Sequence, residues 1–243
     1  MTTELPLVGD YSTDSVADSG LRVGVAVFPG TLGDRDITRA LTRHGIEAVQ
    51  LWHRDTDLQD VDAVILPGGS SYGDYLRPGA LAANAPLIKA IKAGVEKGLA
   101  VLGTGNGFQI LTEAGLLPGA FKMNDSARYH NSAETLTVAN NSTAFTKDFS
   151  KDERIVLPLS VGYGNYWVDE ATAAELAENN QIVLRYAENP HGSTQAIAGV
   201  ANREGNVVGL LPQAEYAIEA GFGPSTDGAR VFTSLLSSLA GGK

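Results

Sequence analysis

The sequence contains no cysteine. This absence excludes disulfides, thiolate metal ligands and catalysis by a thiol nucleophile. Histidine is scarce as well. The four histidines are scattered, with no His-x-x-His pair and no acidic partner at metal-ligand spacing. Metal sites need such clusters. We therefore expect no metal site, and no motif indicates an organic cofactor.

The chain also has few basic residues and no long apolar run. The chain has 18 Lys and Arg against 28 Asp and Glu, a formal net charge of -10. This balance argues against a nucleic-acid partner, since phosphate contacts need clustered cations. No apolar run approaches the about 20 residues of a membrane helix, and the acidic N-terminal residues lack the basic start of a secretory signal. We expect a cytoplasmic protein with no membrane partner.

What is present in the first half is a regular alternation of apolar runs and amphipathic segments. Such alternation with short connections is typical of a doubly wound α/β fold, in which ligands bind at the carboxyl ends of the strands. The expected strands are residues 22–28, 48–53, 61–66 and 99–102, and the expected helices are residues 34–43 and 87–97.

The pattern changes after residue 119. Further strands are expected at residues 135–138, 154–159, 182–186 and 207–211, with Gly205-Asn206 as a hairpin turn, and helices at residues 171–179 and 227–239. We predict a three-layer, flavodoxin-like α/β fold with a mostly parallel sheet and added antiparallel strands. Residues 1–20 are expected to form a flexible arm, and residues 21–243 a single domain.

One stretch indicates a reactive turn. An apolar run at residues 99–102 precedes three glycines at alternate positions, and a helix is expected from Phe108. Strand, Gly-rich turn and helix in this order are typical of a nucleophile elbow, whose apex residue should be Cys or Ser. The apex here is Gly105, which has no side chain. The glycines do not have the G-x-G-x-x-G spacing of a dinucleotide loop.

Further motifs follow in the order and spacing of a known family. They are residues 67–77 (PGGSSYGDYLR), 106–109 (NGFQ), 162–165 (GYGN), 212–215 (PQAE) and 227–228 (DG). Together they resemble the class I glutamine amidotransferases, in particular the glutaminase subunits of phosphoribosylformylglycinamidine synthase. The resemblance covers residues 21–239. It implies a scaffold that releases ammonia from glutamine and passes it to a synthetase subunit in purine biosynthesis.

The resemblance also assigns three residues to the catalytic triad of the family. Gly105 stands at the position of the cysteine, Gln213 at that of the histidine, and Glu215 at that of the acidic residue. A neutral amide cannot accept a proton as an imidazole does near neutral pH. Two of the three triad members are therefore missing, and by analogy with a protease triad the rate should fall by about 10⁶-fold.

The remaining site residues are also implied by the family pattern. Gly68 and Gly69, with Asn106 just after the elbow apex, correspond to the loop and the turn whose backbone amides stabilise an oxyanion. Gln109 lies at the position of the glutamine pocket, and Tyr163 replaces an acidic residue there. We predict a pseudoenzyme without glutaminase activity, acting as the partner of a synthetase subunit or as a binding subunit with a small-molecule ligand in its cleft.

Two alternatives stay open. The first is an enzyme with different chemistry in the same cleft, using Glu215, Tyr163 or Thr104. A hydroxyl nucleophile would need a base, and no histidine stands at a matching position. The candidate hydroxyls are those of Thr104, Ser70, Ser71 and Ser160. The second is a plain interaction module, in which an outer face binds a partner and the cleft stays empty.

Overall fold

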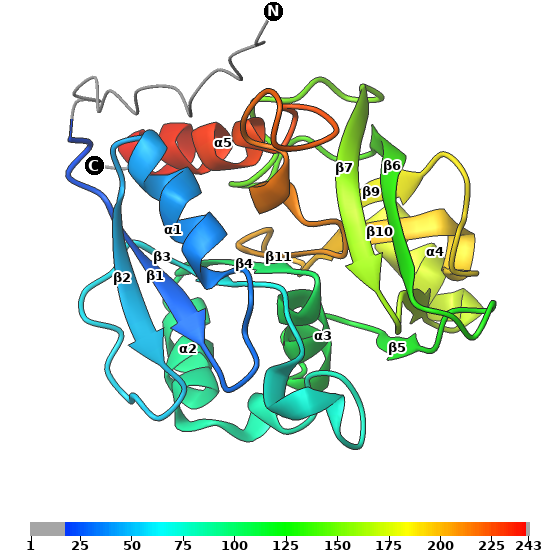
Figure 1. Ribbon diagram of the computed structural model, residues 1–243, viewed down its shortest axis with the longest axis horizontal. Helices are drawn as coiled ribbons and strands as arrows, with labels where there is room; N and C mark the ends of the chain where they lie inside the picture. The colour runs from blue at the N-terminus through cyan, green and yellow to red at the C-terminus, as the bar shows by residue number, and fades with distance from the viewer. Residues whose placement is uncertain (1–17, 242–243) are drawn as a thin grey trace, which may run out of the picture.

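The computed structural model describes residues 18–241, in which nine strands form one sheet in the order β2-β1-β3-β4-β11-β10-β9-β6-β7 (Figure 1). The first five strands of this order are parallel to one another. They are β2 (Glu47–Trp52), β1 (Arg22–Val27), β3 (Ala63–Leu66), β4 (Ala100–Thr104) and β11 (Val207–Leu210). Their arrangement is the flavodoxin-like order 2-1-3-4-5, with β11 as the fifth strand.

Helices cover both faces of the parallel strands. Figure 1 shows α1 (Asp34–Arg43) and α5 (Ala229–Ala240) on one side, and α2 (Pro86–Val95) and α3 (Asn106–Glu113) on the other. Because both faces are covered, β3, β4 and β11 are buried along their whole length. In the last four residues of the edge strand β2, buried and exposed side chains alternate. The predicted three-layer, mostly parallel fold is confirmed.

The second half of the chain extends the sheet with antiparallel strands. These strands are β10 (Ile197–Ala201), β9 (Ile182–Tyr186), β6 (His130–Val138) and β7 (Arg154–Val161). A separate antiparallel pair is formed by β5 (Ala120–Lys122) and β8 (Asn165–Trp167), and α4 (Glu170–Glu178) follows it. Short 3₁₀ turns lie at Ser71–Asp74, Ala82–Asn84, Thr194–Ala196 and Ala214–Tyr216.

Several elements differ from the sequence-based expectation. Strands β5, β8 and β10 were not expected, and the predicted turn at residues 205–206 joins β10 to β11. Helix α3 begins at Asn106, two residues before the expected Phe108, so that Gly105 directly precedes its first turn. Strand β6 begins at His130, five residues before the expected start, and this earlier start reaches the candidate site.

The N-terminal arm lies mostly outside the described part of the chain, which excludes residues 1–17. The end of the expected arm contacts the turn that precedes β2, where the Ser19 N–H and hydroxyl donate to the Gly45 carbonyl at 2.9 and 2.7 Å. Among the helices of residues 18–241, none combines the length and the apolar composition that a membrane span requires.

Candidate functional site

The turn between β4 and α3 has the backbone of a nucleophile elbow. Gly105 adopts φ 52° and ψ −114°, and its N–H donates to the Leu210 carbonyl of the neighbouring strand at 2.9 Å. The Gly105 carbonyl accepts from the Phe108 N–H at 3.1 Å, which closes the first turn of α3. Such a conformation is strained for a residue with a side chain. Position 105 therefore keeps the shape of a reactive turn but offers no reacting atom.

Gln213 lies directly opposite this turn. A Cβ added to Gly105 would be 3.3 Å from Gln213 Nε2, and one added to Gly68 would be 2.5 Å from the same nitrogen. The Gln213 N–H donates to the Pro158 carbonyl at 2.8 Å, which fixes the backbone of this residue against β7. The side chain is 7% exposed, and its amide forms no hydrogen bond with any residue from 18 to 241. The fold thus brings together the residues that the motif order predicted.

Glu215 is buried beside the end of β4. Its Oε1 accepts a hydrogen bond from the Thr104 hydroxyl at 2.9 Å, while its Oε2 has no hydrogen-bond partner in the described structure. Burial raises the pKa of Glu215 to about 7, against the opposing effect of backbone N–H groups and the Thr104 hydroxyl. The carboxyl is therefore partly protonated near neutral pH. Among the side chains of the described residues, its hydrogen-bond partner is the Thr104 hydroxyl and not Gln213.

The loop after β3 runs directly beneath the Gln213 amide. Gly69 has φ +142°, and a Cβ there would lie 2.5 Å from the Gly30 carbonyl oxygen, so only glycine fits without a shift of the backbone. The Gly68 carbonyl accepts from the N–H groups of Leu32 and Gly33 at 3.0 and 3.2 Å. These bonds hold the loop between the end of β1 and the candidate site.

The predicted pocket residues of α3 are hydrogen-bonded within the fold. The Asn106 side chain accepts from the Ser71 N–H at 3.0 Å and donates to Gln109 Oε1 at 2.9 Å. Gln109 Nε2 in turn donates to the Tyr163 carbonyl at 2.9 Å. This chain of bonds connects the two loops to α3. Their role in substrate binding stays a prediction, since none of Asn106, Gln109 and Tyr163 lines the cavity next to Gln213.

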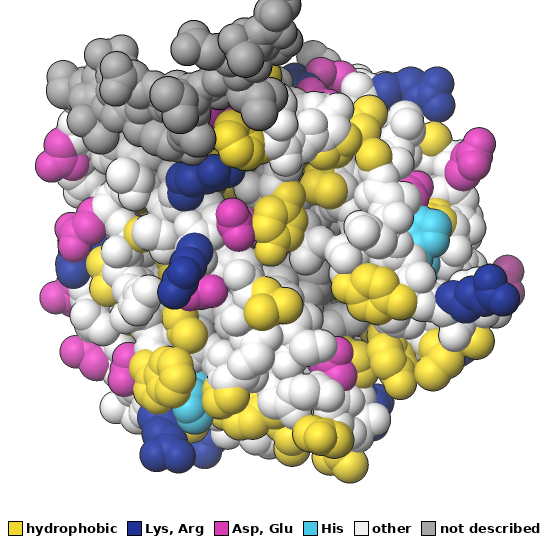
Figure 2. All heavy atoms as spheres, viewed as in Figure 1, with side chains coloured by type: hydrophobic (Ala, Val, Ile, Leu, Met, Phe, Trp, Pro, Cys, Tyr) yellow, Lys and Arg dark blue, Asp and Glu magenta, His cyan; other side chains and the backbone are white. Residues whose placement is uncertain are grey.

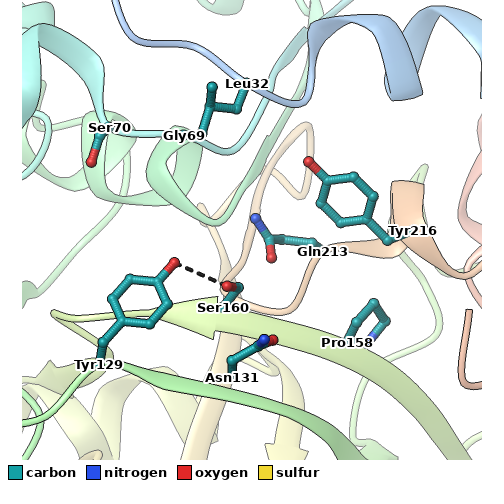
Figure 3. A pocket seen from close by; sticks show the side chains of 9 residues that line it. All are labelled: Leu32, Gly69, Ser70, Tyr129, Asn131, Pro158, Ser160, Gln213 and Tyr216. Atoms are coloured by element: carbon teal, nitrogen blue, oxygen red, sulfur yellow. Dashed lines mark hydrogen bonds between the residues drawn. The ribbon is translucent and has the colours of Figure 1, made fainter.

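A cavity of about 360 Å³ opens beside Gln213 (Figure 3). It is lined by Leu32, Gly69, Ser70, Tyr129, Asn131, Pro158, Ser160, Gln213 and Tyr216. None of these side chains carries a charge near neutral pH. Figure 2 shows a hollow in the middle of this face with hydrophobic side chains around it and Lys and Arg side chains away from it.

Several lining residues were missed by the sequence-based prediction, among them Tyr129, Asn131 and Tyr216. The first two reach the cavity because β6 begins early and pairs with β7, which places Asn131 opposite Ser160. The Tyr129 and Ser160 hydroxyls are 2.9 Å apart. Tyr216 ends the 3₁₀ turn that also contains Glu215. No alternation of polar and apolar residues marks this part of the chain, because His130, Asn131 and Ser132 are all polar.

The histidines do not complete a new triad. His53 Nδ1 is 2.8 Å from the Tyr72 hydroxyl, and His130 Nε2 is 3.0 Å from Glu134 Oε1. His191 is fully buried against the His130 ring, and burial lowers its pKa to about 4. Over residues 18–241, no histidine hydrogen-bonds a hydroxyl of the cavity, and no cluster of three metal-ligating side chains occurs.

Comparisons with known proteins agree on one family. The model of the CobB/CobQ-like glutamine amidotransferase domain matches residues 20–230. The chain is 50% identical over 218 residues to the phosphoribosylformylglycinamidine synthase subunit PurQ of Corynebacterium jeikeium, covering 90% of this chain and 98% of that protein. It is 46% identical over 219 residues to the subunit PurQ of Corynebacterium glutamicum, with the same coverage of 90% and 98%.

A solved structure extends this likeness to three dimensions. A chain in the structure of PurLQS from Thermotoga maritima superposes with a TM-score of 0.83 at 42% identity, covering 89% of this chain and 98% of that one. Family model, sequence and fold thus agree over nearly the whole length. The chain belongs to the PurQ family of glutamine amidotransferases.

Proposed function

We propose that this chain is a PurQ-type subunit without glutaminase activity, which acts as a partner or binding subunit of a synthetase. The observation that carries the proposal is the elbow apex, where Gly105 keeps the φ and ψ of a reactive turn and has no side chain. No other position compensates through a thiol, because the sequence contains no cysteine.

The chemistry of the neighbouring groups supports the same conclusion. Glutamine hydrolysis through a covalent intermediate needs a nucleophile and a base that accepts its proton. The amide of Gln213 cannot take this role, although it occupies the right place opposite Gly105. Glu215 is hydrogen-bonded to Thr104 and has no ring to orient. We infer that glutamine is not hydrolysed here.

The proposed partner follows from the relatives. The matched proteins are described as subunits of phosphoribosylformylglycinamidine synthase, and the matched structure is that of PurLQS. Since this chain spans nearly the full length of these proteins, we infer an association with a synthetase subunit of the same type. The cytoplasm is the proposed location, and purine biosynthesis the proposed setting.

A co-expression experiment tests both parts of the proposal. The chain is produced with the synthetase subunit of its own organism, and complex formation is measured by size-exclusion chromatography. We expect a complex that makes its product with ammonium ions and ATP but not with glutamine and ATP. Glutamine-dependent product, or ammonia release from glutamine above a buffer blank, would contradict the loss of glutaminase activity. Separate elution of the two proteins would contradict the partnership.

A second candidate function is an enzyme with altered chemistry in the same cleft. The observation that favours it is the buried pair of Thr104 and Glu215, in which the carboxyl has a raised pKa of about 7 and one free oxygen. A carboxyl with such a pKa suits acid–base chemistry at neutral pH. If an activity is found, Glu215→Gln should abolish it, whereas unchanged activity in this variant would exclude the role.

A further inference from the structure

The cavity beside the elbow contains an amide that the fold leaves free. Gln213 is 7% exposed, lines the cavity, and has no hydrogen-bond partner for its side chain among residues 18–241. Neither of its amide atoms is among the fully buried, unpartnered polar atoms of the described residues, so both keep contact with solvent in the cavity. A ligand with a matching acceptor and donor could replace this water at the amide. The geometry of the amide therefore indicates the part of a ligand that it would bind.

The side chains that line the cavity offer no positive charge to an anionic ligand. None of the lining side chains is a Lys or Arg that could neutralise a phosphate or carboxylate. Burial raises the pKa of the Tyr216 hydroxyl, and the carboxylates of Glu215, Asp36 and Asp34 raise it further. With no cation in the lining and carboxylates close behind Tyr216, the cavity favours an uncharged ligand.

Aromatic rings flank the free amide. Figure 3 shows the Gln213 amide between the phenol rings of Tyr129 and Tyr216, directed into the cavity. Tyr129 is 69% exposed, so that its ring is available for contact with a ligand. Stacking on an aromatic side chain stabilises a bound nucleobase whatever its identity, because every base has a π-face. The volume of about 360 Å³ lies within the range of small-molecule sites, about 300–1,000 Å³.

We propose that this cavity binds an uncharged planar ring that presents a hydrogen-bond donor and acceptor side by side, such as adenine or a ring carboxamide. The Gln213 amide pairs with this edge through two hydrogen bonds, the geometry by which glutamine recognises adenine. Tyr129 and Tyr216 contact the faces of the ring. The proposal goes beyond the proposed function and does not depend on it, because Gly105 is not among the residues that line the cavity.

Titration calorimetry on the full chain tests the proposal. Adenine and nicotinamide are the two probes, and their comparison separates a nucleobase edge from a ring carboxamide. Glutamine and inorganic phosphate are the comparison ligands. We expect saturable binding of at least one ring probe and weaker binding of both comparison ligands. Absence of binding by both rings, or preferential binding of glutamine or phosphate, would overturn the proposal.

Site variants test which residues bind the ring, and a matched control variant shows whether a loss of affinity comes from misfolding. Gln213→Leu should weaken binding of the ring about tenfold or more, because it removes a bidentate pair. The matched control Gln50→Leu, on the exposed side of β2, should leave the affinity unchanged. Tyr129→Ala changes an exposed residue and should weaken binding by about 5-fold or more. Unaltered affinity in Gln213→Leu or Tyr129→Ala would refute the assignment.

A parallel assay separates this proposal from the proposed function. Ammonia release from glutamine is measured on the same preparation that is used for calorimetry. Ring binding together with ammonia release would contradict the loss of glutaminase activity and leave the ligand site in place. Absence of ring binding together with absence of ammonia release would overturn the ligand site alone.

Discussion

Restoring the two missing side chains should restore glutamine hydrolysis. The perturbation is the double variant Gly105→Cys and Gln213→His, which places a thiol at the elbow apex and an imidazole opposite it. A Cβ at position 105 would lie 3.3 Å from Gln213 Nε2 and 3.5 Å from Gly68 Cα. The contacts are tight, but shifts of a few tenths of an ångström accommodate them. The thiol and the imidazole would then be neighbours.

The size of the effect follows from the geometry and from the chemistry of such pairs. A side chain at φ 52° is strained, so the cysteine should lower the free energy of unfolding by about 1–3 kcal/mol. A positioned base contributes about 10²–10⁴-fold to the rate, and we expect a gain of this order over the parent chain. Each single variant should stay near the parent rate, because the nucleophile and the base act as a unit.

Ammonia release is measured with a coupled dehydrogenase assay, and the glutamyl thioester on Cys at position 105 by mass spectrometry of the intact protein. Gly105→Ala with Gln213→His is the control, since it adds the strain and the base without a thiol. Circular dichroism confirms folding of each variant. A folded double variant that neither releases ammonia nor carries the thioester would refute the view that these two side chains alone block hydrolysis.

Three further predictions concern stability and titration. Burial raises the pKa of Glu215 from its ordinary 4.5 to about 7, so its contribution to stability is full below about pH 4.5 and is lost as the pH rises through 7, about 3 kcal/mol in urea denaturation. Glu215→Gln should flatten this slope. Gly69→Ala should destabilise by about 2 kcal/mol or more in thermal unfolding, because its Cβ would meet the Gly30 carbonyl at 2.5 Å. Gly115→Ala, also at positive φ but in open space, should lose only about 1 kcal/mol. The His191 ring, whose pKa burial lowers to about 4, should stay neutral in NMR titrations down to that pH, and a midpoint near 6.5 would contradict its burial.

The parallel half of the fold could be predicted from sequence because its strands are buried on both faces. Continuous apolar runs such as residues 63–66 and 100–102 result from that burial. Strand β10 could not be predicted, because its alanines and glycine give neither a β-branched run nor a polar alternation. Its place in the sheet depends on pairing with β9 and β11, which is a property of the tertiary structure.

The candidate site was predictable only in part, for a similar reason. Gly105, Gln213 and Glu215 belong to local motifs whose order implied that they meet, and the structure places them together. Tyr129 faces the cavity because β6 pairs with β7 beside it. Tyr216 faces the cavity because it ends the 3₁₀ turn Ala214–Tyr216, which lies next to the cavity. Such contacts depend on strand register, which no short motif records.

Pro158 in the edge strand β7 limits the pairing of this sheet with another copy of the chain. β7 is the last strand of the nine-stranded sheet, and Pro158 lies in its middle. An unprotected border strand invites pairing with another chain, and proline there withholds a donor. The Pro158 carbonyl is already taken by the Gln213 N–H. The segment around Gln213 therefore also covers the outer edge of β7 at Pro158 and protects the sheet from pairing with another chain. Deleting this segment would expose the edge strand and favour aggregation.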